Sequence, residues 1–251
     1  EKAGRGIRLT PAGRVLLKWA QRVRFDVEDA RREIADMKKG LSGHIRLGIV
    51  PTAAQFILPP AARKLLATAP DVTLRTVVGL IDTLKPLLHA GELDLMVGTE
   101  SPLEPGFTSQ RLAEDRIVVA ASATHPLFAG PVRLADLTRH RWVLQPPGAP
   151  TRDWLDHTFD RKRLPRPRVQ VESTMLLMLP ALIAETGLLS FISRHHLDAP
   201  DGRSPLKEVA IKETTMHRRL VVTYRESSYL MPAARLLIEL FQDAADRKSV
   251  V

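Results

Sequence analysis

Residues that could carry out chemistry are few in this sequence, and none of them forms a catalytic motif. The 251-residue chain contains no cysteine, which excludes disulfides and thiolate metal ligands. His195 and His196 are adjacent, and adjacent side chains on a helix or strand point in different directions, so they form a poor metal clamp. The serine-nucleophile, metalloprotease and phosphate-loop patterns are missing as well. We therefore expect no enzyme, no metal site and no cofactor.

Charged side chains are weaker candidates for binding an anion. Asp153 and Asp156 fall in the first turns of an expected helix, where the helix dipole by itself favours acidic residues. Arg152, at the start of the same helix, is a candidate for binding an anion. Arg218 and Arg219 could contact an anion as well, but we expect them at a solvated strand end.

The order of the expected elements predicts where a ligand binds. Periodicity predicts strands over 44–50, 72–79 and 94–98 and helices over 51–70 and 80–93. This β-α-β-α-β order predicts a parallel sheet covered by helices. Thr52 is an expected N-cap of the first helix, and the pair Pro59 and Pro60 predicts a break within it.

A second α/β half follows the first. Two separate extended stretches are expected over 107–115 and 116–122, and the second one begins the new half. The Met- and Leu-rich run 174–183 is expected in the core. A final amphipathic helix is expected over 229–246. We predict an α/β fold of two lobes, with lobe I over 44–115 and 219–251 and lobe II over 116–218.

Ligands of open parallel sheets bind beyond the carboxyl ends of strands, where helix N-termini offer free N–H groups. The loops that follow the expected strands of both lobes are therefore expected to face one cleft. The candidate ligand-binding residues are Thr52, Ala53, Gly98, Thr99, Gln145 and Ser173, together with Arg152.

A long helix is expected in front of the two lobes, over residues 10–40. Thr10 is a good N-cap, Pro11 suits the first helical position, and Gly40 is a plausible stop. Apolar residues recur along it at spacings of four and three, which is a heptad seam that needs a partner helix. The seam consists of Leu16, Ala20, Val23, Val27, Ala30, Ile34 and Met37. We predict dimerisation through it; the alternative is a helix that lies on its own domain.

The net charge of +9 is concentrated near the N-terminus. Residues 1–25 carry seven basic side chains and one acidic one. Such a basic block indicates a polyanion, usually nucleic acid, or else a solubilising terminus. Without cysteine, a hydrophobic leader or a long apolar run, the chain is expected to be cytoplasmic.

Several segments together resemble LysR-type transcriptional regulators. "RGIRLTPAGRVLL" at 5–17 is similar to the end of the family's winged helix-turn-helix and the start of its linker helix. The later segments, in family order, are "GHIRLGIVPTAAQFILPP", "LHAGELDLMVG", "HPLF", "WVLQPPG" and "AETGLLSFIS". The sequence around "WVLQPPGAPTR" most resembles the branch that includes regulators of galactose-binding protein and of protocatechuate metabolism.

The resemblance implies a linker helix followed by a two-lobed effector domain like that of type II periplasmic binding proteins. It implies a sugar or an aromatic or carboxylic acid as effector, a homodimer or homotetramer, and double-stranded DNA as partner. Residues 1–9 would be the remnant of the wing, with Arg5 and Arg8 as its DNA contacts. The alternative is a solute-binding protein of a transport system, which would share the fold.

Overall fold

The computed structural model describes residues 2–3, 6–39, 41–198 and 204–249. The chain divides into two compact units. Unit 1 comprises residues 1–112 and 221–251, and unit 2 comprises residues 113–220. The units are described separately below.

Unit 1 is built on the predicted parallel strands. These are β3 (Gly43–Ile49), β4 (Val72–Val78) and β5 (Leu95–Thr99). β3 lies between β4 and β5 and is parallel to both. The connecting helices are α2 (Pro51–Phe56), α3 (Leu58–Thr68) and α4 (Ile81–His89). The predicted break in the first helix is present, at Ile57, because Pro59 and Pro60 begin a new helix instead of continuing the old one.

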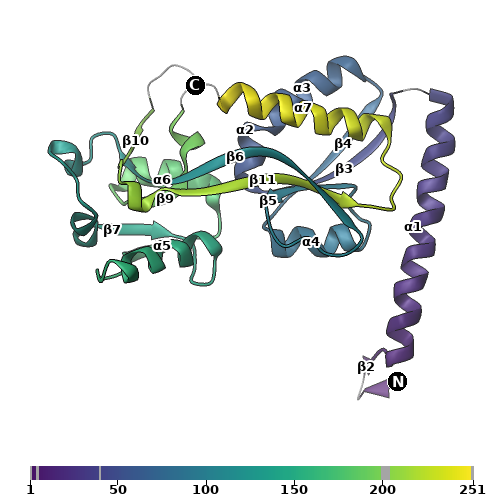
Figure 1. Cartoon of the computed structure of the whole chain (residues 1–251), viewed down its shortest axis with the longest axis horizontal. Helices are drawn as coiled ribbons and strands as arrows, with labels where there is room; N and C mark the ends of the chain where they lie inside the picture. The colour runs from purple at the N-terminus through teal and green to yellow at the C-terminus, as the bar shows by residue number, and fades with distance from the viewer. Residues whose placement is uncertain (1, 4–5, 40, 199–203, 250–251) are drawn as a thin grey trace. The chain divides into compact units, whose positions relative to one another are not determined.

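Helices cover both faces of this sheet. α3 packs beside α7 (Pro232–Ser249), the closing helix, on one face, and α4 lies on the other (Figure 1). Ile45, Leu47 and Ile49 of β3 are fully buried. Gly48 faces Leu84 of α4 and Leu93, which follows α4, and a methyl group there would lie 3.2 Å from the Leu84 side chain and 2.5 Å from that of Leu93, so both side chains pack closely on this position.

Unit 2 contains a second parallel pair, β7 (Arg141–Leu144) and β8 (Arg168–Glu172). Its helices are α5 (Pro150–Arg161) and α6 (Leu179–Thr186), with short 3₁₀ turns between elements. Trp142 and Phe159 are fully buried and meet edge to face, with ring centroids 6.3 Å apart. β9 (Ser190–Ser193) and β10 (Leu206–Glu208) pair antiparallel with the strand β6.

Two long strands have residues in both units. β6 (Phe107–Ser122) and β11 (Met216–Arg225) are neighbours in the sheet. The prediction of two separate extended stretches at 107–115 and 116–122 was wrong, because β6 is one continuous strand of 16 residues. Its charged centre stays in the strand because Asp115 is neutralised there by Arg218.

The N-terminal helix α1 (Pro11–Lys39) is a single element of 29 residues. The predicted cap is confirmed, since the Gly13 N–H donates to Thr10 Oγ1 at 2.9 Å. The predicted stop, Gly40, lies outside the described residues. Before α1, β1 (Lys2–Ala3) and β2 (Gly6–Ile7) form a small antiparallel pair. In the described part of the chain, no helix has the length and apolar character needed to cross a bilayer.

Candidate functional site

The predicted ligand-binding positions of unit 1 converge at one edge of its sheet. β3 and β5 run in register, with Ile49 opposite Val97, so the residues after both strands are neighbours. The Val50 N–H donates to the Val97 carbonyl at 3.0 Å, which joins the two strand ends. Thr52, in the first turn of α2, and Thr99, the last residue of β5, therefore lie at the same edge of the sheet.

Thr52 does not cap its helix as predicted. The N-cap of α2 is Val50, Pro51 occupies the first helical position, and Thr52 lies one residue further in. Proline favours that first position because it has no N–H to satisfy there. Thr52 is 4% exposed and Ala53 is fully buried. The Thr52 hydroxyl thus belongs to the first turn of α2.

Glycine at position 98 is required by close packing at the end of β5. A methyl group there would overlap the end of the Ile81 side chain at the start of α4. Gly98 is buried, whereas the next residue, Thr99, is partly exposed. The Ile81 side chain of α4 therefore packs directly against the backbone of β5, one residue before its last residue, Thr99.

The predicted positions of unit 2 converge in the same way. Leu144 of β7 is opposite Glu172 of β8, and the Ser173 N–H donates to the Leu144 carbonyl at 3.0 Å. Gln145 and Ser173 therefore leave neighbouring parallel strands together. The Thr151 hydroxyl, in the first turn of α5, donates to Gln145 Oε1.

Arg152 is buried and already has an acidic partner. Its Nε lies 2.9 Å from Asp156 Oδ2, and both side chains are 9% exposed. Its Nη1 donates to the Gln145 carbonyl at 3.2 Å. The helix dipole by itself favours an acid at position 156, and the pairing of Asp156 with Arg152 is an additional reason for it. Arg152 thus braces the loop that carries Gln145.

The Met- and Leu-rich run 174–183 is not core throughout, which corrects that prediction. Met175, Leu177 and Met178 are 62%, 42% and 36% exposed. They belong to or flank a short 3₁₀ turn, Leu176–Met178, and burial is reached only in α6, at Leu179 and Ile183. An exposed apolar surface therefore follows Ser173 directly in the chain.

Unit 2 contains a buried ionic cluster that was not predicted from the sequence. The Asp115 side chain is fully buried. It accepts hydrogen bonds from Ser193 Oγ at 2.6 Å and from Arg218 Nε at 2.8 Å, and Arg218 Nη2 lies 2.6 Å away. The prediction that Arg218 lies at a solvated strand end was wrong, because its guanidinium balances this buried charge. The cluster ties β6, β9 and β11 together.

Two histidines of unit 2 are held neutral by their surroundings. Burial lowers the pKa of His196 from its usual value of 6.5, Asp115 opposes this shift, and the nearby His195 and Arg218 side chains add to it. Burial lowers the pKa of His125 as well, with a contribution from His140.

The predicted seam of α1 is solvent-exposed in the single chain. Leu16, Val23, Val27 and Ile34 are 70%, 59%, 54% and 60% exposed, and nothing is described of the Met37 side chain. Contiguous exposed apolar surface is typical of sites that interact with another protein, so dimerisation through the seam stays a prediction.

The opposite face of α1 contacts its own unit. In the heptad defined by the seam, Phe25 occupies the position diametrically opposite. Its ring lies directly on Gly91, so that any side chain at 91 would overlap it. The Arg225 guanidinium lies 4.8 Å from the ring centroid, and Arg24 donates to the Ala90 carbonyl at 3.2 Å. The helix can therefore touch its own unit and present the seam at the same time.

The sequence pattern of the LysR substrate binding domain family matches residues 38–246. The chain belongs to this family. The predicted family and the predicted periplasmic-binding-protein-like α/β fold are thereby confirmed.

Three LysR-related proteins illustrate the similarity. The HTH-type transcriptional regulator GbpR of Rhizobium radiobacter is 29% identical over 199 residues, which cover 77% of this chain and 66% of that protein. GalR of Pseudomonas putida is 26% identical over 239 residues, covering 94% and 60%. The CcmR regulatory domain of Synechocystis PCC6803, solved in complex with 2-PG, has a TM-score of 0.70 at 22% identity, covering 81% and 98%. The chain thus spans less than two thirds of the length of GbpR and of GalR.

Proposed function

We propose that this chain is the linker and effector-binding region of a LysR-type transcriptional regulator. The exposed seam of α1 carries the proposal, because such a seam in front of a two-unit α/β domain serves to pair protomers. GbpR and GalR, which are HTH-type regulators by name, support it. A solute-binding protein would have no use for the seam. We assign the chain no catalytic step and a cytoplasmic location.

The effector, on this proposal, is a small sugar or an aromatic or carboxylic acid bound at the strand ends of the two units. In unit 1 the Thr52 hydroxyl would contact its oxygens, with Thr99 alongside. In unit 2 Gln145 and Ser173 would do the same. Arg152 would act by holding the loop of Gln145 in place. The complex of CcmR with 2-PG supports binding of a small molecule by this fold.

Regulation would follow from differential binding. An effector can shift the arrangement of protomers only by as much as its affinity differs between the two arrangements. Pairing through α1 would place two DNA-binding heads, of which residues 1–9 would be the last part, at a fixed separation. Arg8 is exposed there, and Arg5 lies outside the described residues. Whether two or four protomers assemble would set how many heads are positioned.

A ligand screen followed by one substitution tests the effector site. Sugars and aromatic acids are screened by thermal shift on the intact chain, and the affinity of any hit is then measured by calorimetry. Thr52→Val removes the hydroxyl and keeps the side-chain shape, so it should weaken binding about fivefold to tenfold, the value of one hydrogen bond. Thr68→Val, on the exposed end of α3, is the matched control and should change nothing. Equal affinity of the wild type and the Thr52 variant would refute the site.

A further inference from the structure

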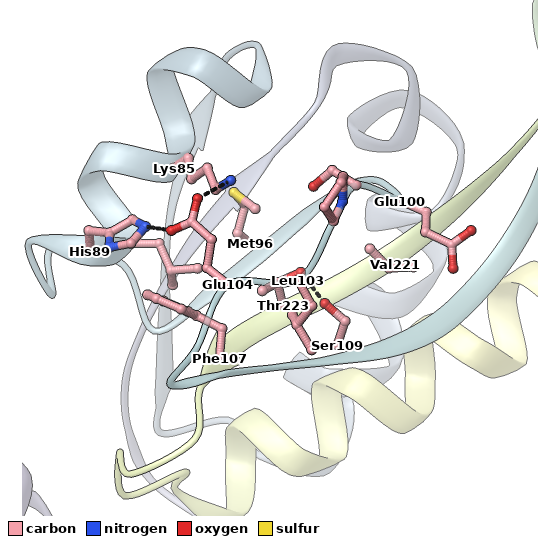
Figure 2. Close-up of a pocket in the computed structure, with 13 residues that line it drawn as sticks. Lys85, His89, Met96, Glu100, Leu103, Glu104, Phe107, Ser109, Val221 and Thr223 are labelled. Atoms are coloured by element: carbon pink, nitrogen blue, oxygen red, sulfur yellow. Dashed lines mark hydrogen bonds and ion pairs between the residues drawn. The ribbon is translucent and has the colours of Figure 1, made fainter.

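A cavity of about 200 Å³ lies in unit 1 beneath α4, and none of the predicted effector-binding residues is among those that line it (Figure 2). Its walls are mostly apolar and include Leu88 of α4, Met96 of β5, Phe107 of β6 and Val221 of β11. An apolar cavity of roughly 150 Å³ is large enough to hold benzene. The space therefore fits a single ring with one small substituent.

One hydrogen-bond donor is available inside the cavity. Ser109 Oγ and Thr223 Oγ1, on β6 and β11, lie 2.8 Å apart, so one hydroxyl donates to the other (Figure 2). The proton of the accepting hydroxyl remains for a third partner. A ligand with one hydroxyl or carbonyl oxygen would satisfy it.

The charges around the cavity disfavour an anion. On its solvent side Glu104 pairs with Lys85 Nζ at 2.5 Å and with His89 Nε2 at 2.8 Å (Figure 2). The hydrogen bond from Lys85 lowers the pKa of the Glu104 carboxyl, so it stays ionised. Glu100 lines the cavity as a second acid. Lys85 and His89 are thus already paired with Glu104, and an anion would have to compete with this carboxylate for them.

We propose that this cavity is a second small-molecule site of the chain, for an uncharged single-ring phenol or alcohol. Its apolar walls would cover the ring, and the hydroxyl pair of Ser109 and Thr223 would donate to the oxygen. Glu104, held by Lys85 and His89, keeps the segment after β5 in place over the ligand.

A ligand in the cavity would be connected to α1 through Leu88. The Leu88 side chain lines the cavity, and its carbonyl accepts a hydrogen bond from Arg225 Nη1 at 3.2 Å. Arg225 also stacks on Phe25 of α1. A ligand that displaces Leu88 therefore moves the contact between α4 and the helix that, under the proposed function, pairs protomers.

Methionine methyl groups provide the direct test of binding. The chain has six methionines, so ¹³C-methyl labelling gives six signals, and Met96→Leu identifies the one in the cavity. Phenol should shift the Met96 signal saturably and show a nuclear Overhauser contact to it. Met231, buried in unit 1 but outside the cavity, is the control and should not move. Benzoate, with the same ring and a negative charge, should leave Met96 unchanged at concentrations where phenol saturates.

Two substitutions of Ser109 distinguish the effect of filling the cavity from the effect of removing a hydrogen bond. Ser109 is exposed at the edge of the cavity, so Ser109→Phe should fill it and abolish the phenol shift, whereas Ser109→Ala should weaken binding about fivefold. The other five methyl signals report whether the Ser109→Phe protein is folded. The site is refuted if phenol leaves wild-type Met96 unmoved or without that contact, if benzoate binds equally well, or if folded Ser109→Phe still binds.

Fluorine signals test the route to α1. In protein labelled with 4-fluorophenylalanine, the Phe25 signal should shift at the same phenol concentration as Met96, while Phe241, buried in α7, stays constant. If phenol shifts the Met96 signal but not the Phe25 signal, the proposed connection from the cavity to α1 is wrong. Thr52→Val should leave the phenol response intact, so failure of this site and failure of the proposed effector site are distinguishable.

Discussion

Replacing Arg218 by methionine should destabilise unit 2 severely. The fully buried Asp115 carboxylate would keep Ser193 as a donor and lose both nitrogens of Arg218, which lie 2.8 and 2.6 Å away. Leaving one member of a buried ion pair without its partner costs about 3–5 kcal/mol. The Arg218 side chain is 15% exposed, so water reaches it and the lower end, about 3 kcal/mol, is the better figure. Removal of both charges in Asp115→Asn/Arg218→Met should recover most of this loss.

Urea unfolding followed by tryptophan fluorescence measures this effect, because Trp142 is fully buried in unit 2. Arg219→Met, at the exposed neighbouring position, is the control and should cost less than about 0.5 kcal/mol. A loss below about 1 kcal/mol for Arg218→Met, against the buried-pair expectation, would refute the reasoning. So would a double variant no more stable than the single one.

Two further predictions concern the contact between Gly91 and Phe25 of α1 and the lowered pKa of His196. Gly91 has a φ of +65° and lies against Phe25, so Gly91→Ala should lower the free energy of unfolding by about 1–3 kcal/mol. The loss should be smaller when Phe25 is also replaced by alanine. Equal losses in the two backgrounds, measured in a double-mutant cycle by thermal unfolding, would show that the contact is absent. The lowered pKa of His196 means that its stabilising contribution is complete above pH 6.5 and is lost as pH falls below it, because the unfolded chain binds the proton more readily. Unfolding free energies at pH 7.5 and 5.5 should therefore differ more for the wild type than for His196→Asn, and an unchanged difference would contradict this.

Local patterns in the sequence predicted the elements and their order. Alternating apolar residues marked β3 and a short apolar run marked β5, and the βαβ order then required a parallel sheet with strand ends at one edge. Thr52 and Thr99 could be placed together for this reason, and so could Gln145 and Ser173. The α1 seam is a local pattern too, since a heptad needs only one helix to be recognised.

Contacts between distant residues could not be predicted in this way. Asp115 is 78 residues from Ser193 and 103 from Arg218, and nothing in a single sequence links them. Without that pairing, the charged residues around Asp115 indicated a break, although the strand is continuous.

Composition gave a wrong prediction for residues 174–183, and the preference of threonine for N-caps gave a wrong prediction for Thr52. Residues 174–183 have the composition of a core, yet the backbone turns in 3₁₀ form and exposes Met175 and Met178. Thr52 has the side chain of an N-cap, but Pro51 before it starts the helix earlier. Local backbone geometry decided the outcome in both cases.

The molar mass in solution tests most directly whether α1 pairs two protomers. Light scattering on the intact chain should give at least twice 27.9 kDa. Val27→Asp places a charge in the seam of each protomer and should weaken pairing at least ~100-fold, since burial of two valine side chains is worth about 3 kcal/mol or more. Val15→Asp is the matched control, because Val15 is 59% exposed on the same helix but off the seam, and it should leave the mass unchanged. A wild-type mass of 27.9 kDa, or a Val27→Asp protein that still pairs as the wild type does, would contradict the account.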